Sequence, residues 1–375
     1  MDPFPFPPRS VSVNVDSTTT LGSGGTLDWW GRASIARRPD GVLVLGYQRA
    51  TGHEVNDGSG IHLRMSHDNG ATWSDEDRDV SGSAITKAPL FPPSLGANMD
   101  PGEPWLTYTP KGDLLCFTWR VDYSATSDGT CIFRSTDDGE TWDSGTDTIH
   151  WSGQTSAEDS RTYCTDDGFY IGSKMYVAGR VHGADADFSS AVVMMTSTDD
   201  GVSWSRDATL VSSAGPPTHG AIELGMERVG NSDFIAMIRD TDHQKSYRAT
   251  SSDLGATWSA LEDVSSTVGI AGRQRVYTRA HLKGQANWWN DPVVLMVGFV
   301  HQTPGDWQDR RNCVWVSRDH GVTWSTPFYI DSRTPDGGYG DIFYDADNDQ
   351  YVVVNYHGTP KAASLKQYRL TIAGV

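Results

Sequence analysis

The sequence has no long apolar run and no recognisable export signal. No stretch of about 18 apolar residues occurs in the 375-residue chain, so we expect no transmembrane helix. Residues 1–9 interrupt two phenylalanines with prolines and contain no hydrophobic signal core. Either the protein is not exported by that route, or a leader has been removed and the protein is extracellular. The sequence leaves the compartment open.

Basic residues are scarce relative to acidic ones. The chain has 30 Lys and Arg against 48 Asp and Glu, which gives a formal net charge of −18 at pH 7. Such a balance disfavours nucleic acids and anionic membrane surfaces as partners. It does not exclude an anionic substrate, because a few arginines gathered in one pocket can reverse the local field.

Cysteine is also rare, and nothing in the sequence has metal-ligand spacing. The four cysteines fit no zinc motif. We expect Cys116 and Cys131 to lie on neighbouring strands, where either a cross-strand disulfide or buried free thiols can form, and we favour the thiols. The histidines without ligand spacing are expected to be structural or to contact substrate, and they are His53, His62, His150, His182 and His219.

What the sequence does contain is an eight-residue segment of the form Ser-x-Asp-x-Gly-x-Thr/Ser-Trp. Its five copies are Ser66–Trp73, Ser135–Trp142, Ser197–Trp204, Ser251–Trp258 and Ser317–Trp324. Their starts lie 69, 62, 54 and 66 residues apart, so one structural unit recurs along the chain. Ser and Asp hydrogen-bond nearby backbone groups, and Gly permits the positive φ of a tight turn. We expect each copy to staple a hairpin and not to belong to a site.

Each unit is typical of four antiparallel strands, the blade of a β-propeller. A sixth unit, over residues 338–355, lacks the repeated segment. The alternating stretch Ser10–Val15 is expected to supply its outer strand and to pair the two chain ends. The sequence therefore predicts an all-β, six-bladed β-propeller of four-stranded antiparallel blades. The N- and C-terminal strands close the ring, and residues 1–375 form one domain.

In a propeller, the starts of first strands and the ends of second strands converge on one funnel. The positions that fall there carry many charged side chains and a tyrosine, namely Arg32, Glu103, Glu223, Tyr339, Arg49, Arg120, Arg180 and Arg239. A structural core does not need several arginines around one axis, because a desolvated Arg is costly without a partner. The pattern favours a funnel that binds an anion.

These residues resemble those of the exo-α-sialidases, and the eight-residue segment resembles the Asp-box, or BNR repeat, of that superfamily. Arg32 lies nine residues before the turn Gly41, and Glu223 lies sixteen residues before Arg239, as family members place their residues. An arginine just upstream of the last Asp-box and a tyrosine opening the last unit complete the pattern. The resemblance covers nearly the whole chain.

The resemblance implies a mechanism. Retaining sialidases use a neutral Tyr as nucleophile, activated by a Glu base, and bind the substrate carboxylate with three arginines. Tyr339 is then the nucleophile and Glu223 its base. Arg32, Arg239 and Arg311 form the carboxylate clamp, and Arg49, Glu103 and Arg120 are further substrate-binding residues. No metal or organic cofactor is required, and the partner is a glycan with a terminal acidic sugar.

Two positions have alternatives. The acid/base is expected at Asp57, 25 residues after Arg32, although it lies close to the first Asp-box; Glu54 is the reserve. For the third arginine, strand alternation relative to Ser317 favours Arg311, which we choose, while an Arg-x-Asn pattern favours Arg310.

The predicted function is that of a retaining exo-glycosidase that hydrolyses terminal sialic acid, or a related ulosonic acid, from glycoconjugates. The family follows its first Arg with Ile-Pro, whereas this chain has Ala33 and Ser34, which leaves room for another acidic sugar. The alternatives are a hydrolase or lyase of another acidic polysaccharide on the same fold, and a carbohydrate-binding propeller without catalysis. Product identity on different glycans distinguishes them.

Overall fold

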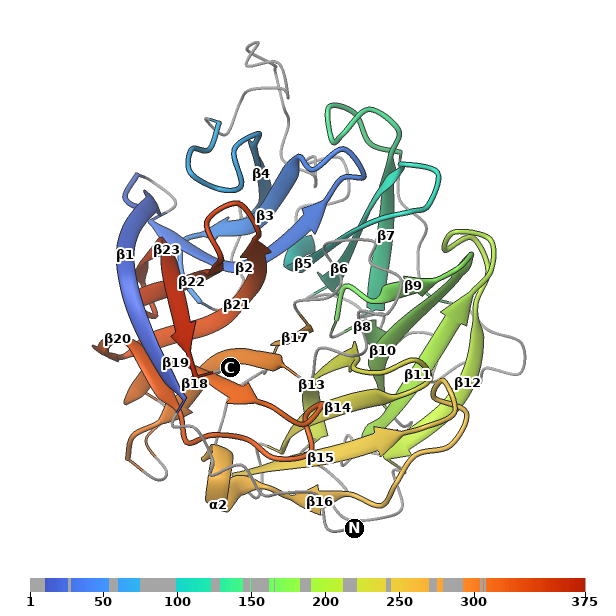
Figure 1. Ribbon diagram of the computed structural model, residues 1–375. Helices are drawn as coiled ribbons and strands as arrows, with labels where there is room; N and C mark the ends of the chain where they lie inside the picture. The colour runs from blue at the N-terminus through green and yellow to red at the C-terminus, as the bar shows by residue number, and fades with distance from the viewer. Residues whose placement is uncertain are drawn as a thin grey trace.

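The structure is a computed structural model in which β-strands dominate (Figure 1). It describes residues 11–25, 28–53, 60–74, 99–122, 129–143, 149, 162–164, 166–182, 190–211, 221–240, 244–269, 275–278, 293–303, 306 and 308–374. Within these residues the helix is a single turn, α2 (Ser265–Val268). No helix in the described part of the chain is long and apolar enough to cross a membrane.

Four of the sheets are antiparallel throughout. The first contains β5 (Met99–Tyr108), β6 (Leu114–Asp122) and β7 (Gly129–Ser135). The second contains β8 (Thr162–Cys164), β9 (Phe169–Ile171), β10 (Lys174–His182), β11 (Ser190–Ser197) and β12 (Ser205–Val211). The third contains β13 (Ala221–Arg228), β14 (Phe234–Asp240), β15 (Lys245–Ser251) and β16 (Glu262–Asp263). The fourth contains β17 (Arg275–Thr278), β18 (Val294–His301), β19 (Arg310–Ser317) and β20 (Phe328–Thr334).

A seven-stranded sheet combines the two ends of the chain. One antiparallel run is β2 (Trp29–Arg37), β3 (Leu43–Ala50) and β4 (Gly60–Ser66), and the other is β21 (Asp336–Asp345), β22 (Gln350–Thr359) and β23 (Ala362–Ala373). A single parallel pair, Trp29 with Ala363, joins the runs. Strand β1 (Ser12–Gly22) pairs antiparallel with β23, which confirms the expected pairing of the two chain ends.

The apolar core lies between successive sheets, which Figure 1 shows arranged around a common centre with β2, β5, β13, β17 and β21 innermost. Trp105 and Phe117 of one sheet, for example, pack with Met175 and Val193 of the next. A comparable cluster joins β18 and β19 to β22, and another joins β22 to β3. Each sheet therefore buries both faces, which explains the apolar second strands of the sequence.

Buried hydrogen bonds also tie innermost strands to one another. Asp341 Oδ2 accepts from Ile35 N at 2.7 Å, and Ser34 Oγ accepts from Leu106 N at 2.9 Å. The carboxylate of Asp166 accepts from Met226 N at 2.6 Å in the same way. These bonds satisfy backbone donors that face the centre instead of a neighbouring strand.

All five Asp-boxes form the same turn. In the first, Ser66 Oγ accepts from Gly70 N at 2.8 Å, and Asp68 accepts from the backbone and hydroxyl of Thr72 at 2.8 and 2.7 Å. The residue before each box glycine has positive φ, from 52° at Asn69 to 60° at Asp138. The role expected from the sequence, a hairpin staple, is confirmed.

The four cysteines are buried free thiols. Cys116 on β6 and Cys131 on β7 lie on neighbouring strands, as expected, but Cys116 pairs in register with Phe133 and Cys131 with Thr118. The offset register explains why adjacent strands bring no disulfide here.

Candidate active site

Bulges shape the strands that carry four of the residues expected at the site. Between Gly31 and Ser34, β2 has one residue more than β3 opposite it. The same irregularity occurs in β5 beside Glu103, in β13 beside Glu223 and in β21 beside Tyr339. A bulge bends a strand and redirects a side chain. Repeated at the same end of innermost strands, it turns Arg32, Glu103, Glu223 and Tyr339 toward one another.

Two of these residues hold a strained backbone. Arg32 and Tyr339 have φ values of 56° and 51°. Of the described non-glycine residues that lie inside strands, these two have a positive φ. Such a conformation costs about 1–3 kcal/mol and persists only where the surroundings enforce it. Before Tyr339, Gly338 has φ of 117°, and a Cβ there would lie 2.0 Å from the Phe299 ring. The strain is concentrated on the residues that face the centre.

The tyrosine hydroxyl is bound by a carboxylate and an arginine from another sheet. Tyr339 donates to Glu223 Oε1 at 2.7 Å, and Arg239 Nη1 donates to Glu223 Oε2 at 2.6 Å and to the Tyr339 hydroxyl at 3.1 Å. Burial, followed by the Glu223 charge, raises the pKa of Tyr339 above its usual range. The phenol is therefore neutral at pH 7 and needs a base to release its proton.

Three arginines with little exposed surface each face a carboxylate. Arg239 pairs with Glu223 as above, and Arg32 Nε lies 3.6 Å from Glu103 Oε1. Arg310 Nη1 donates to Asp336 Oδ1 at 3.0 Å. The guanidinium carbons of Arg239 and Arg310 lie 5.7 and 4.7 Å from the centre of the Phe299 ring, so these two cations share one aromatic side chain.

A second polar group adjoins Tyr339. His53, just after β3, places Nδ1 3.0 Å from Asp336 Oδ2, and Trp29 Nε1 donates to the same oxygen at 2.9 Å. The Tyr356 hydroxyl donates to Asp336 Oδ1 at 3.2 Å. The His53 ring centre lies 6.0 Å from that of Tyr339, edge to face. Asp336 thus links the arginine of one pair to the histidine beside the tyrosine.

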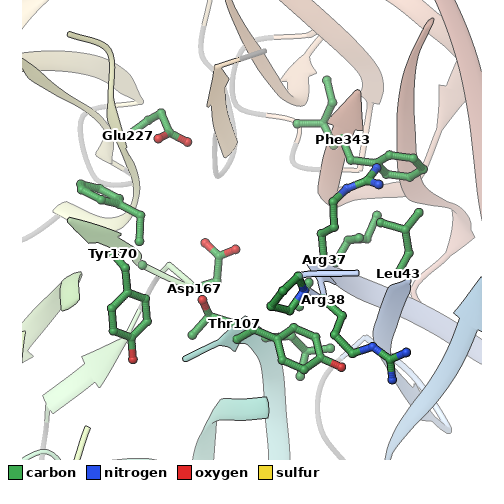
Figure 2. A pocket seen from close by; sticks show the side chains of 16 residues that line it. Arg37, Arg38, Leu43, Thr107, Asp167, Tyr170, Glu227 and Phe343 are labelled. Carbon is green, nitrogen blue, oxygen red and sulfur yellow. The ribbon is translucent and has the colours of Figure 1, made fainter. Parts of the chain in front are cut away.

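The innermost strands also line a cavity at their other end, near the Asp-boxes (Figure 2). It measures about 430 Å³, and its lining includes Arg37, Thr107, Glu227 and Phe343. These residues lie four or five positions along the strands from Arg32, Glu103, Glu223 and Tyr339. Figure 2 shows the carboxylates of Asp167 and Glu227 across the cavity from Arg37 and Arg38. This cavity is separate from the Tyr339 cluster.

The expected position of the third arginine, Arg311, is corrected by the structure. The structure brings Arg310, and not Arg311, to the cluster, because the Arg311 guanidinium stacks 4.1 Å from the Tyr329 ring and donates to Asp331 O at 2.8 Å. Strand alternation counted from Ser317 does not identify the site residue, because both faces of β19 are buried. The odd positions Cys313 and Trp315 pack against the preceding sheet, so parity identifies a face but not the centre.

Other expected site residues are placed differently or lie outside the description. Arg49 on β3 lies over the Trp30 ring, 4.1 Å from its centre, and not in the three pairs. Arg120 is on β6, but its side chain is outside what the structure describes. Asp57 and the alternative Glu54 lie outside the described residues. Arg180 on β10 lies over the Tyr163 ring, 4.7 Å from its centre, and burial lowers its pKa while nearby negative charges oppose that effect.

Comparisons with known proteins agree with this architecture. A family model described as a BNR repeat-like domain matches residues 93–276. A solved protein of unknown function from Dyadobacter fermentans covers 98% of this chain and 100% of its own, with 16% identity and a TM-score of 0.71. The Hadza microbial sialidase Hz136 has 17% identity and a TM-score of 0.64 over 91% of this chain, and the Trypanosoma rangeli sialidase has 15% and 0.62 over 96%. The chain has a sialidase-like fold built on BNR repeats.

The sialidase-like fold accounts for most of this chain but not for the whole of the sialidases it matches. The chain spans 65% of the length of the Hadza sialidase and 59% of the Trypanosoma rangeli sialidase. A search of curated proteins gave no match. At 12–17% identity, these structural likenesses concern the fold.

Sequence reasoning missed several members of the site in this sialidase-like fold. Asp336, Tyr356, Phe299 and Trp29 were not singled out as site residues, and His53 was left between a structural and a substrate-contacting role. A signal for Asp336 existed, because it opens the same strand as Tyr339, three residues earlier. A signal for His53 was its position at the start of the loop that was expected to hold the acid.

Proposed function

We propose that this protein is a retaining exo-glycosidase that releases a terminal sialic acid, or a related ulosonic acid, from glycoconjugates. The observation that carries the proposal is the Tyr339–Glu223–Arg239 contact, in which a neutral phenol donates to a carboxylate at 2.7 Å. A nucleophile hydrogen-bonded to its base is the arrangement that covalent catalysis requires. We also propose that the antiparallel runs are the blades of a closed six-bladed propeller, supported by apolar clusters between successive sheets.

The reaction follows from the charges. A sugar that carries its carboxylate on the anomeric carbon repels an anionic nucleophile, so a neutral phenol is suited to attack there. Tyr339 Oη forms the bond to the anomeric carbon while its proton passes to Glu223, and the glycosidic oxygen leaves that carbon with a proton from the acid/base. Water then attacks the same carbon and gives a proton to the acid/base, as the bond to Tyr339 breaks and Tyr339 recovers its proton from Glu223. Arg239 stabilises the negative charge that develops on the phenol oxygen.

The substrate carboxylate would be bound by Arg32, Arg239 and Arg310. Charge-assisted hydrogen bonds of this kind contribute about 1.5–3 kcal/mol each. Each guanidinium is already held by a carboxylate, which fixes its orientation before substrate binds. The acid/base predicted from the sequence, Asp57 with Glu54 in reserve, lies outside the described residues and stays a prediction.

The test is release of fluorophore from a 4-methylumbelliferyl sialoside by the wild-type protein and by Tyr339→Phe. We expect wild-type turnover and a loss of at least about a thousandfold in the variant, because removing a nucleophile eliminates the covalent route. The matched control is Tyr170→Phe, a tyrosine that lines the cavity at the other end of the strands and should keep wild-type activity. Turnover of Tyr339→Phe near the wild-type rate would rule out the proposed nucleophile.

A further inference from the structure

His53 is held rigidly at the Tyr339 site, but the reaction above gives it no task. Its backbone is fixed on both sides, because His53 N donates to Pro360 O at 2.8 Å and Arg32 Nη2 donates to His53 O at 2.9 Å. Its side chain is 17% exposed, whereas that of Asp336 is fully buried. A histidine fixed in this way beside a nucleophile has few degrees of freedom to lose on binding substrate.

Asp336 determines which ring nitrogen carries the proton. Burial opposes ionisation of Asp336, but the hydrogen bond from His53 and the nearby charge of Arg310 outweigh it and lower its pKa, so both oxygens are acceptors. His53 Nδ1 lies 3.0 Å from Oδ2 and must therefore donate. Nδ1 carries the hydrogen in the neutral ring, which leaves the lone pair on Nε2.

The Nε2 atom is the ring nitrogen that the contact with Asp336 leaves for a substrate. Among the residues that the structure describes, none hydrogen-bonds to Nε2, while Nδ1 contacts both Asp336 and the Tyr356 hydroxyl. The ring is flanked by Trp29 at 5.4 Å and Tyr339 at 6.0 Å between ring centres. The imidazole thus lies beside the ring of the tyrosine that carries the nucleophilic oxygen.

We propose that His53, oriented by Asp336, is the acid/base of this site in place of the carboxylate expected in the loop after it. The inference rests on the proposed glycosidase reaction. In the first step Nε2–H gives its proton to the glycosidic oxygen as the bond from that oxygen to the anomeric carbon breaks. In the second step a water molecule gives its proton to Nε2 as its oxygen bonds to that carbon and the bond to Tyr339 breaks.

Asp336 has two effects in this scheme. It holds the imidazole in one orientation, and its charge stabilises the imidazolium that the first step requires. Among the described residues, the groups that face the ring are Asp336, Tyr356, Tyr339, Trp29, Arg32 and Arg310. Burial lowers the pKa of His53 below 6.5, Asp336 opposes that effect, and Arg32 and Arg310 add to it. The acid form is consequently populated on the acidic side, and turnover that needs it falls as pH rises.

The test uses the leaving group as a probe. The wild-type, His53→Gln, Asp336→Asn and Asp57→Asn proteins are assayed on two substrates. One is sialyllactose, whose alcohol needs protonation, and the other is a 4-methylumbelliferyl sialoside, whose phenol leaves without it. We expect His53→Gln to lower kcat/KM on sialyllactose about 10²–10⁴-fold and to lose at least ten times less on the aryl substrate. Asp336→Asn should show the same selectivity with a smaller loss, and a structural histidine predicts no such selectivity.

The pH profile supplies a second measurement in case His53→Gln does not fold. For the wild type, kcat/KM on sialyllactose should fall as pH rises through the pKa of His53, below 6.5, and the aryl substrate should not show that fall. Equal losses on both substrates, or selectivity that appears in Asp57→Asn instead, would overturn the role of His53 and leave the proposed function standing. Absence of wild-type turnover on either sialoside would overturn both.

Discussion

The two ends of the innermost strands contain similar residues and use them differently. Glu223 and Glu227 are both buried carboxylates on β13, four residues apart. Glu223 binds a tyrosine and an arginine, the former from another sheet, whereas Glu227 Oε1 accepts from the adjacent backbone of Arg228 at 2.9 Å. Likewise Arg38, at the Asp-box end, pairs with Asp40 of its own turn and with Asp138 of a neighbouring box. A buried charge therefore does not by itself locate an active site.

What separates the ends is the backbone. The bulges in β2, β5, β13 and β21 all lie at the Tyr339 end, and beyond them the paired strands keep a regular register to the Asp-box end. Inside the described strands, positive φ at non-glycine residues occurs at Arg32 and Tyr339, on that same end, whereas at the Asp-box end it occurs in turns. Strain inside a strand is costly where nothing is gained from it, so its position favours function at the Tyr339 end.

The largest effect should separate the two glutamates of β13 when each is replaced by glutamine. Glu223→Gln removes the base that receives the Tyr339 proton, so we expect kcat/KM on a 4-methylumbelliferyl sialoside to fall by about 10²–10⁴-fold. Glu227→Gln, on the same strand, should stay within about twofold of wild type, and steady-state kinetics measure both.

Thermal unfolding of both variants serves as the control, because a buried glutamine in either place can weaken the fold. Equal losses of activity from folded Glu223→Gln and Glu227→Gln would contradict the comparison. That outcome would make the cavity of Figure 2 a participant in the reaction.

A smaller effect should separate two adjacent arginines. Arg310→Lys keeps the charge near Asp336 but loses the planar fork that binds a carboxylate with two hydrogen bonds. We expect kcat/KM to fall about ten- to a hundredfold, mainly through KM, as one charge-assisted hydrogen bond is lost. Arg311→Lys, whose side chain stacks on Tyr329, should change kcat/KM less than twofold. The reverse ranking would restore the sequence-based choice of Arg311.

Much of the fold was predictable because it repeats. Each Asp-box has its own hydrogen bonds within the turn, including one from the box Gly to the box Ser. Five local patterns therefore predict five hairpins without any long-range contact. The pairing of β1 with β23 was predictable for a similar reason, since an alternating strand at one end met an incomplete unit at the other.

The site was predictable only in part. Arg32, Glu223, Arg239 and Tyr339 stand at recognisable spacings, and the structure brings them together. Arg311 was chosen over the alternative Arg310 because alternation along a strand with two buried faces does not reveal which face approaches the centre. Asp336 and His53 are 283 residues apart in the sequence. Their contact depends on the parallel approach of β2 to β23 and on one backbone hydrogen bond, from His53 N to Pro360 O, and neither has a sequence signal.

The smallest effect concerns the Asp-box end alone. Asp319 accepts from Ser317 Oγ, Thr323 N and Thr323 Oγ1 at 2.8, 2.8 and 2.6 Å. Burial would raise its pKa, but the bonds from Thr323 and Ser317 outweigh it and hold the pKa below 3.8. A lowered pKa stabilises the fold at neutral pH, and this contribution disappears as pH falls through that pKa.

Asp319→Ala should therefore lower the free energy of unfolding by about 1–3 kcal/mol at pH 7 in urea titrations. The difference in unfolding free energy from wild type should shrink below pH 3.8. We expect kcat/KM to stay unchanged, because the turn holds a hairpin and touches no substrate. A stable but inactive variant would instead link the box to the site.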